Sequence, residues 1–226
     1  MDYFKKPLIS STRDAVYHTL KEQIMSLTLL PGATISEKEM SVSFNVSRTP
    51  VRESFVQLSQ EGLLDIYPQR GTVVSRIDLE LVDEARFIRE HLESAVIRLV
   101  CSSLFPEESL GKLQMNLASQ KVCMDVQNYK TMFELDEAFH RTIFEGCKKM
   151  NTWAVIQQIN VHLNRTRMLR LATDHHWEEL FKQHQQIVEA IQAQEPDKAE
   201  QVVHAHLHVG ISDQAVLKEK FPEYFK

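Results

Sequence analysis

The 226-residue chain has only three cysteines, no Cys-x-x-Cys pair and no apolar run long enough to cross a bilayer. An odd number of widely spaced cysteines argues against a disulfide framework and a thiolate zinc site, and such cysteines are typically small buried residues. A spanning helix needs about 20 consecutive apolar residues, so we expect no membrane segment. The first residues lack the apolar core of a signal peptide, which makes a cytoplasmic protein the expectation.

The chain also lacks a dominant charge, since 26 Lys/Arg oppose 31 Asp/Glu and the net charge is −5. Up to Asp78 the two signs balance, so a nucleic-acid binder of this composition must gather its basic residues on one surface. The hydrophobic content of 43% is that of an ordinary globular protein, and the length suits two domains. The ten histidines are the unusual surplus, and nine of them lie beyond residue 90.

The first part of the chain predicts three helices. Apolar residues recur at helical spacing over about residues 12–27, which indicates an amphipathic helix. Ser36 and Glu39 form the pattern of a capping box that opens a short second helix. A third helix is expected to begin after Ser47 and to end at Gly62.

Two short β-prone runs, 63–67 and 72–75, follow the third helix and are separated by residues 68–71, a pattern typical of a hairpin. Three helices and a two-stranded wing make up the winged helix-turn-helix plan, with the third helix in the recognition position. We therefore predict a DNA-binding domain over residues 1–76.

The third helix carries side chains suited to reading bases near its N-terminus. Ser47 can cap the helix by accepting a hydrogen bond from a backbone N–H, and Pro50 is tolerated in a first turn. Arg48, Thr49 and Arg52 share one exposed face, because positions three and four apart are neighbours. Each arginine can offer two parallel donors to guanine, and Thr49 suits a thymine methyl group or a phosphate. The alternative is an ordinary capped helix with a solvated basic face.

Outside this helix, Lys38 and the pair Arg70 and Gly71 suit phosphate or minor-groove contact. The run Ser-Arg-Thr-Pro-Val-Arg-Glu at 47–53, followed by Glu-Gly-Leu at 61–63, resembles the GntR family of bacterial transcription regulators. The resemblance covers about residues 10–76 and implies a homodimer on an inverted-repeat DNA operator. Carried over by position, it implies DNA contact from Lys38, Ser47, Arg48, Thr49, Arg52, Arg70 and Gly71.

The remainder, residues 77–226, is predicted to be an all-α bundle that senses an effector and dimerises. No strand-like alternation follows residues 76–78, and breaks such as Phe105-Pro106 and Glu195-Pro196 divide the pattern. Six helical stretches are expected, at about 79–103, 107–125, 128–146, 150–172, 176–193 and 195–217. The predicted fold class is therefore mainly α, a winged helix-turn-helix followed by a six-helix bundle.

Four polar residues lie on inward, otherwise apolar helical stripes of this bundle: Asp136, His140, His184 and His206. A single buried histidine is more often a hydrogen-bonded core residue than a metal ligand. Four such groups on three helices are costly to bury unpaired, and one shared divalent cation would satisfy them all. Three imidazoles and a carboxylate suit Zn²⁺, Ni²⁺ or Mn²⁺.

The spacing Asp136-x-x-x-His140, then His184 and His206, resembles the FCD ligand-binding domain that accompanies one branch of the GntR family. This resemblance covers about residues 79–217, and the six helices resemble the branch of the vanillate regulator. It implies a metal that keeps one or two positions for water or a small organic acid, the effector.

A carboxylate effector also favours a guanidinium clamp. Arg89 lies on an inward stripe of the first bundle helix, and the alternative for it is an internal pair with Glu93. Asn160 and Arg167 share a stripe with Trp153 and are further candidates for effector binding.

The leading interpretation is a ligand-responsive transcription regulator of the bacterial cytoplasm, nucleoid-associated when bound to DNA, and not an enzyme. A metal-dependent hydrolase is the rival, because three histidines and an aspartate around an open metal position can activate water. The third interpretation is a bundle with a purely structural metal.

Overall fold

The computed structural model describes residues 11–69, 71–173, 177–209 and 211–226, with side chains from 214 onward in the last range. The chain divides into two compact units. One comprises Met1–Ile77 together with Phe221–Lys226, and the other comprises Asp78–Lys220. Among the described residues, none of the helices is both long and apolar enough to cross a membrane.

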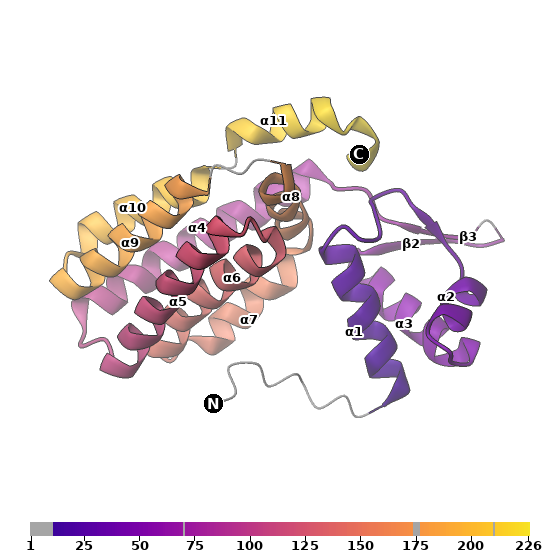
Figure 1. Ribbon diagram of the computed structural model, residues 1–226, viewed down its shortest axis with the longest axis horizontal. Coiled ribbons are helices and arrows are strands. Elements are labelled where there is room, and N and C mark those ends of the chain that lie inside the picture. Colours follow the sequence, from indigo (N-terminus) through magenta and orange to yellow (C-terminus); the bar gives the residue numbers. More distant parts are fainter. Residues whose placement is uncertain (1–10, 70, 174–176, 210) are drawn as a thin grey trace. The chain divides into compact units, whose positions relative to one another are not determined.

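The described residues of the first unit form three α-helices and a small sheet (Figure 1), which confirms the winged helix-turn-helix plan. Helix α3 packs against both α1 and α2, and its apolar face is buried at Val51, Phe55 and Leu58. The elements are α1 (Thr12–Met25), β1 (Thr34–Ile35), α2 (Glu37–Ser43), α3 (Arg48–Gln60), β2 (Leu64–Tyr67) and β3 (Gly71–Val74).

The two predicted helix caps differ in outcome. The Ser36 hydroxyl accepts a hydrogen bond from the Glu39 N–H at 3.1 Å, as the capping box predicts. Ser47 has the extended backbone of a cap, but its side chain makes no capping hydrogen bond, so that prediction is wrong. A cap hydroxyl accepts from the N–H two or three residues later, and the third residue here is Pro50, which has no N–H.

The sheet has the order β1-β3-β2, with both pairs antiparallel. In the predicted wing, Leu64 pairs with Val74 and Tyr67 with Gly71. Gly71 has a φ of 101°, a conformation that favours glycine. The third strand, β1, was not predicted, because a strand of two residues carries no alternation to detect.

The C-terminal tail, Phe221–Lys226, completes the first unit. The Ile77 N–H donates to the Tyr224 carbonyl at 2.8 Å, and the Lys226 N–H donates to the Ile77 carbonyl at 2.9 Å. Phe225 is buried, with 3% of its surface exposed. Assigning all of residues 77–226 to the second domain was therefore wrong for the tail, since a bridge between residues so far apart leaves no local pattern.

The second unit is entirely helical in its described part. All six predicted stretches are largely helical, but the stretch 150–172 is divided at Asn160 and the stretch 195–217 after His208. The six-helix prediction is thereby corrected to eight helices in the part of the unit that the structure describes. They are α4 (Leu79–Ser102), α5 (Glu107–Asp125), α6 (Tyr129–Gly146), α7 (Met150–Ile159), α8 (Val161–Thr173), α9 (Glu178–Ala193), α10 (Pro196–His208) and α11 (Ile211–Lys220).

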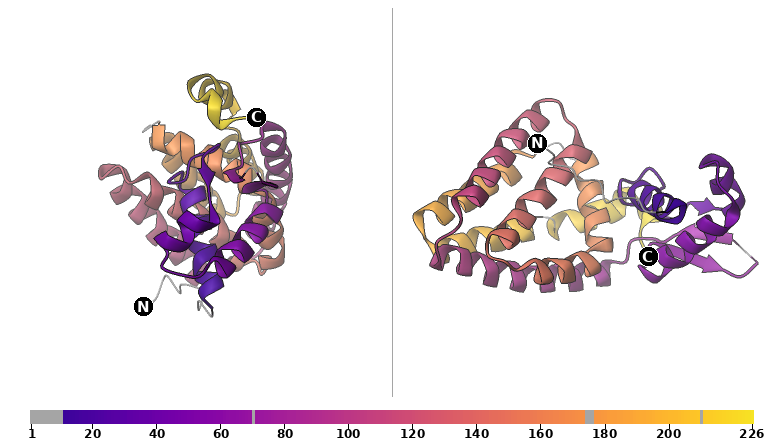
Figure 2. Two further views of the ribbon diagram at one scale, coloured as in Figure 1. Left: turned by 90° about the vertical axis from the view of Figure 1, so that its right-hand side faces the viewer. Right: turned by 90° about the horizontal axis from the view of Figure 1, so that it is seen from below.

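Helix α4 is the longest and packs along α10 and α8, while α9 packs on α10 and α5, and α5 on α6. In the right-hand view of Figure 2, α4 runs along one edge of this unit. Residues of α4, α6 and α9 such as Ile97, Phe139 and Ile187 form the centre of the core.

Candidate functional sites: a basic helix and a buried histidine cluster

The solvent face of α3 presents the residues expected to read DNA. Arg48, Thr49 and Arg52 are all exposed and line a shallow surface hollow together with Glu53. Their orientation follows from the apolar positions of α3, which bury the opposite face of the helix. The two arginines stand four positions apart on one face, as base reading by a helix requires.

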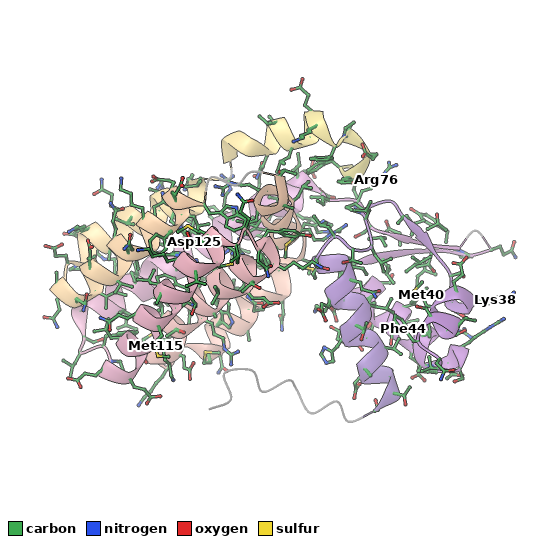
Figure 3. All side chains as sticks on the ribbon, viewed as in Figure 1. Lys38, Met40, Phe44, Arg76, Met115 and Asp125 are labelled. Atoms are coloured by element: carbon green, nitrogen blue, oxygen red, sulfur yellow. The ribbon has the colours of Figure 1, made fainter. Side chains whose placement is uncertain are left out.

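The other residues expected at DNA lie outside this face. Lys38 is exposed, and Figure 3 shows its side chain pointing away from α2. Ser47 and Gly71 are exposed as well. Arg70, the predicted contact at the tip of the wing, lies outside the described residues.

A small ionic cluster joins α1 to the C-terminal end of α3. Glu61 accepts a hydrogen bond from the Tyr17 hydroxyl at 2.6 Å and pairs with the Lys21 ammonium group, also at 2.6 Å. Burial would raise the pKa of Glu61, but hydrogen bonds from Lys21 and Tyr17 lower it below its ordinary value. The cluster helps to hold the recognition helix against α1.

In the second unit, three helices bring Asp136, His140, His184 and His206 together. One ligand atom from each lies within 4.8 Å of the others. Nε2 of His140 is 3.1 Å from Nε2 of His206, and Nε2 of His184 is 3.5 Å from Oδ1 of Asp136. All four residues are buried, each with 8% or less of its surface exposed. The side chains that the sequence selected as inward-facing therefore converge on one point.

Each histidine of this cluster is oriented by an oxygen at its other ring nitrogen. The distances from Nδ1 to these oxygens are 2.6 Å from His140 to Glu93, 2.9 Å from His184 to Gln120, and 3.1 Å from His206 to Gln183. An acceptor at Nδ1 places the ring proton there and leaves the Nε2 lone pair free. Neither glutamine was predicted as a partner, because the role of each depends on how α5 and α9 pack.

The glutamine amides are themselves oriented. The Gln120 amide donates from Nε2 to Oδ1 of Asn116 at 2.6 Å, so its oxygen faces His184. The Gln183 amide donates from Nε2 to Oε1 of Glu179 at 3.3 Å, so its oxygen faces His206. These contacts support one consistent assignment of the ring protons.

The resulting donor set fits a metal ion. With protons on Nδ1, the Nε2 atoms of His140 and His206 face one another as two lone pairs, an arrangement that a cation between them would relieve. Nε2 of His184 is buried without a hydrogen-bond partner among the described residues. A buried polar atom without a partner costs free energy, and a divalent cation held by three imidazoles and one carboxylate satisfies it.

The charges around the cluster favour a neutral imidazole and an ionised carboxylate. Burial lowers the pKa of His184 to about 3 and also lowers the pKa of His206. Burial would raise the pKa of Asp136, but the neighbouring charge of Arg167 lowers it. Burial likewise opposes ionisation of Glu93, yet Arg89 and His140 lower its pKa to about 2. Metal ligands must be in these protonation states.

A cavity of about 60 Å³ adjoins the cluster and is rich in arginine. Asp136 and His206 form part of its wall. Helix α11 contributes Gln214 and Leu217 to the lining. The remaining lining residues are Arg86, Arg89, Leu163, Thr166, Arg167, Arg170, Leu180 and Leu207.

The three residues predicted to bind an effector have different positions. Arg89 lines the cavity and also forms the predicted alternative, a buried pair with Glu93, while its Nη2 has no partner among the described residues. Arg167 lines the cavity and pairs with Asp136 and Glu137. Asn160 is fully buried but does not line the cavity. The sequence analysis missed Arg86 and Arg170, which lie on the same cavity wall.

Comparison with family models gives a match to both units. Residues 12–74 match the model described as bacterial regulatory proteins of the gntR family, and residues 84–209 match the FCD domain. The chain is 34% identical over 192 residues to the HTH-type transcriptional repressor RspR of Escherichia coli, covering 85% of this chain and 84% of that protein.

An uncharacterised HTH-type regulator of Streptomyces ambofaciens is 33% identical over 216 residues, covering 95% of this chain and 90% of that protein. Among solved structures, Escherichia coli McbR/YncC superposes with a TM-score of 0.76 at 21% identity. That match covers 93% of this chain and 99% of McbR/YncC, and at this identity it bears on the fold alone.

Proposed function

The chain belongs to the GntR family of bacterial regulatory proteins and carries an FCD domain, and we propose that a small organic acid controls its affinity for operator DNA. In this proposal the acid binds beside a divalent transition metal in the helical unit. The protein acts as a homodimer on an inverted-repeat operator in the bacterial cytoplasm. The observation that carries the proposal is the arginine-lined cavity directly against the histidine cluster.

The metal would be held by Asp136, His140, His184 and His206, a donor set suited to Zn²⁺, Ni²⁺ or Mn²⁺. When bound, such a metal supplies a Lewis-acidic position for an anionic oxygen. Asp136 and His206 belong to both the cluster and the cavity wall. An acid in the cavity therefore lies next to the metal ligands.

The guanidinium groups favour an anion, and their existing pairs with carboxylates limit the charge that the anion can carry. Arg86 pairs with Asp83 at 2.9 Å, and Arg89 and Arg167 each pair with buried carboxylates. These pairs neutralise much of the positive charge, but Nη2 of Arg89 and Nε of Arg86 still lack partners among the described residues. The pattern suits an acid with one or two carboxylates better than a highly charged polyphosphate.

The volume leads to the same conclusion. One water molecule occupies roughly 10–15 Å³ of such a cavity, so a volume of about 60 Å³ accommodates about four to six water-sized groups. That space suits a short-chain carboxylic or hydroxy acid and excludes a long acyl chain unless the surrounding helices move.

Helix α11 gives the cavity a route to the DNA-binding unit. Gln214 and Leu217 line the cavity, and the chain continues directly from Lys220 into the tail of the first unit. That tail is hydrogen-bonded to Ile77, two residues before the start of α4. An acid that favours one position of α11 therefore shifts the population of arrangements available to the DNA-binding units of the dimer.

The test is a screen of small carboxylic acids against the purified dimer, with thermal unfolding as the readout. Acid binding to the metal-loaded protein should raise Tm, and both removal of the metal and the substitution Arg167→Gln should abolish the shift. Arg98→Gln, which removes an exposed arginine of the same unit, is the matched control. A metal-loaded protein whose Tm and operator affinity ignore every acid would support a structural metal instead.

A further inference from the structure

A second group of metal-ligating side chains lies on the outside of the helical unit. We propose that Glu90, His204 and His208 form a surface site for a divalent transition metal, separate from the buried cluster. One ligand atom from each of the three residues lies within 4.8 Å of the others. The group combines an i, i+4 histidine pair on α10 with a carboxylate from α4.

The distances place both imidazoles around one carboxylate. Nε2 of His204 is 3.1 Å from Oε1 of Glu90, and Nε2 of His208 is 3.6 Å from Oε2 of the same residue. The two rings are stacked, with centroids 4.2 Å apart and planes 15° apart. Positions four apart on a helix can present two imidazoles to one cation, and Glu90 lies opposite them on the neighbouring helix.

The backbone also prepares one ligand. Nδ1 of His208 lies 2.8 Å from the carbonyl oxygen of His204, an acceptor that fixes the ring proton on Nδ1. The Nε2 lone pair of His208 then faces the Glu90 carboxylate, so two acceptors oppose one another. A cation shared by these two groups and His204 removes that conflict.

The surroundings keep this position anionic and open. Glu90 and His204 line a surface hollow with Arg98, whose guanidinium group already pairs with Asp197 at 2.7 Å and with Glu200 at 2.6 Å. No other Lys or Arg lines this hollow among the described residues. His204 is half exposed, so water can complete the coordination of a metal held by three protein ligands.

Two imidazoles and one carboxylate suit Zn²⁺, Ni²⁺ or Cu²⁺, with Cu²⁺ bound most tightly. The affinity should be lower than that of the buried cluster, which has four ligands. The site joins the two helices that carry inward-facing residues of the buried centre, Glu93 on α4 and His206 on α10. A metal bound outside therefore stabilises the helix pair that supports the centre inside.

The test uses the full-length protein, freed of metal with a chelator. Calorimetric titration of this protein with Zn²⁺ should show a tight first event and a second, weaker event, each of one ion per chain. His204→Ala, His208→Ala and Glu90→Gln should each weaken that event at least tenfold. All three side chains are at least partly exposed, and matching circular dichroism spectra and Tm values before Zn²⁺ addition establish that the variants are folded.

His91→Ala is the matched control, because His91 lines the same hollow but is not among the three ligands. It should leave both events unchanged. The proposal is overturned if the wild-type protein takes up only the first equivalent, or if the second event survives in His204→Ala and His208→Ala. Neither result would affect the buried centre, whose occupancy is reported by the first event.

Discussion

The substitution Gln120→Leu tests how the buried histidine cluster is prepared for a metal. The Gln120 side chain is fully buried, and its amide oxygen lies 2.9 Å from Nδ1 of His184. Leucine has a similar volume but no acceptor. Without the oxygen, the ring proton of His184 can move to Nε2, and this N–H can then donate toward Oδ1 of Asp136, 3.5 Å away. A protonated Nε2 has no lone pair for a metal.

The expected loss can be estimated in two ways. Removing an outer partner of a metal-bound histidine typically costs about 10–100-fold in metal affinity. That range corresponds to roughly 1.4–2.7 kcal/mol. The cost of leaving a buried N–H without an acceptor, about 1–3 kcal/mol, agrees with it.

The assay is competition for Zn²⁺ between the protein and a chromogenic chelator. Gln120→Glu is the control, because it keeps an acceptor oxygen at nearly the same position and should bind Zn²⁺ at least as tightly as the wild type. A Gln120→Leu variant that stayed folded and bound the first Zn²⁺ with unchanged affinity would contradict this prediction. That result would mean that His184 is not held in the proposed tautomer.

Three further predictions concern the DNA-binding unit. Arg48→Ala should cost about 1–3 kcal/mol of discrimination between operator and random DNA, measured by fluorescence anisotropy titration. In the same assay, Lys38→Ala should reduce the slope of log affinity against log salt concentration by about one. The pKa of Glu61 is lower in the folded than in the unfolded protein. Its contribution to stability is therefore fully present above the unfolded pKa of about 4.5 and is lost as pH falls through the folded pKa. Glu61→Gln should therefore cost up to about 1 kcal/mol at pH 7, measured by urea unfolding, and less at pH 3, with exposed Glu53→Gln as control. Phe225→Ala should destabilise the first unit by about 3 kcal/mol, because it empties a buried aromatic site in the tail.

Much of the architecture could be predicted because it depends on local patterns. Helical periodicity located the helices of both units, and the capping box at Ser36 gave the start of α2. Inward stripes selected Asp136 and His140 on α6, because an i, i+4 spacing fixes two side chains on one face of a single helix. Inward stripes also selected His184 and His206, each on a helix of its own. Only the packing of these helices brings the two histidines next to Asp136 and His140.

The features that escaped prediction depend on contacts between distant residues. Gln120 and Gln183 are ordinary helical glutamines until α5 and α9 pack so that their amides meet imidazoles. The return of the tail to Ile77 joins residues that lie far apart in the chain. The break at Asn160 is a local turn between two amphipathic helices, and helical periodicity continues across it without an interruption.

We propose that acid binding and operator binding are coupled through the metal-loaded helical unit. The most direct measurement is the operator affinity of the Zn²⁺-loaded dimer with and without a saturating acid found in the screen, together with the acid affinity with and without operator. The acid should change operator affinity by about 5–150-fold, and the operator should change acid affinity by the same factor. Equal operator affinities in the presence and absence of the bound acid would contradict it.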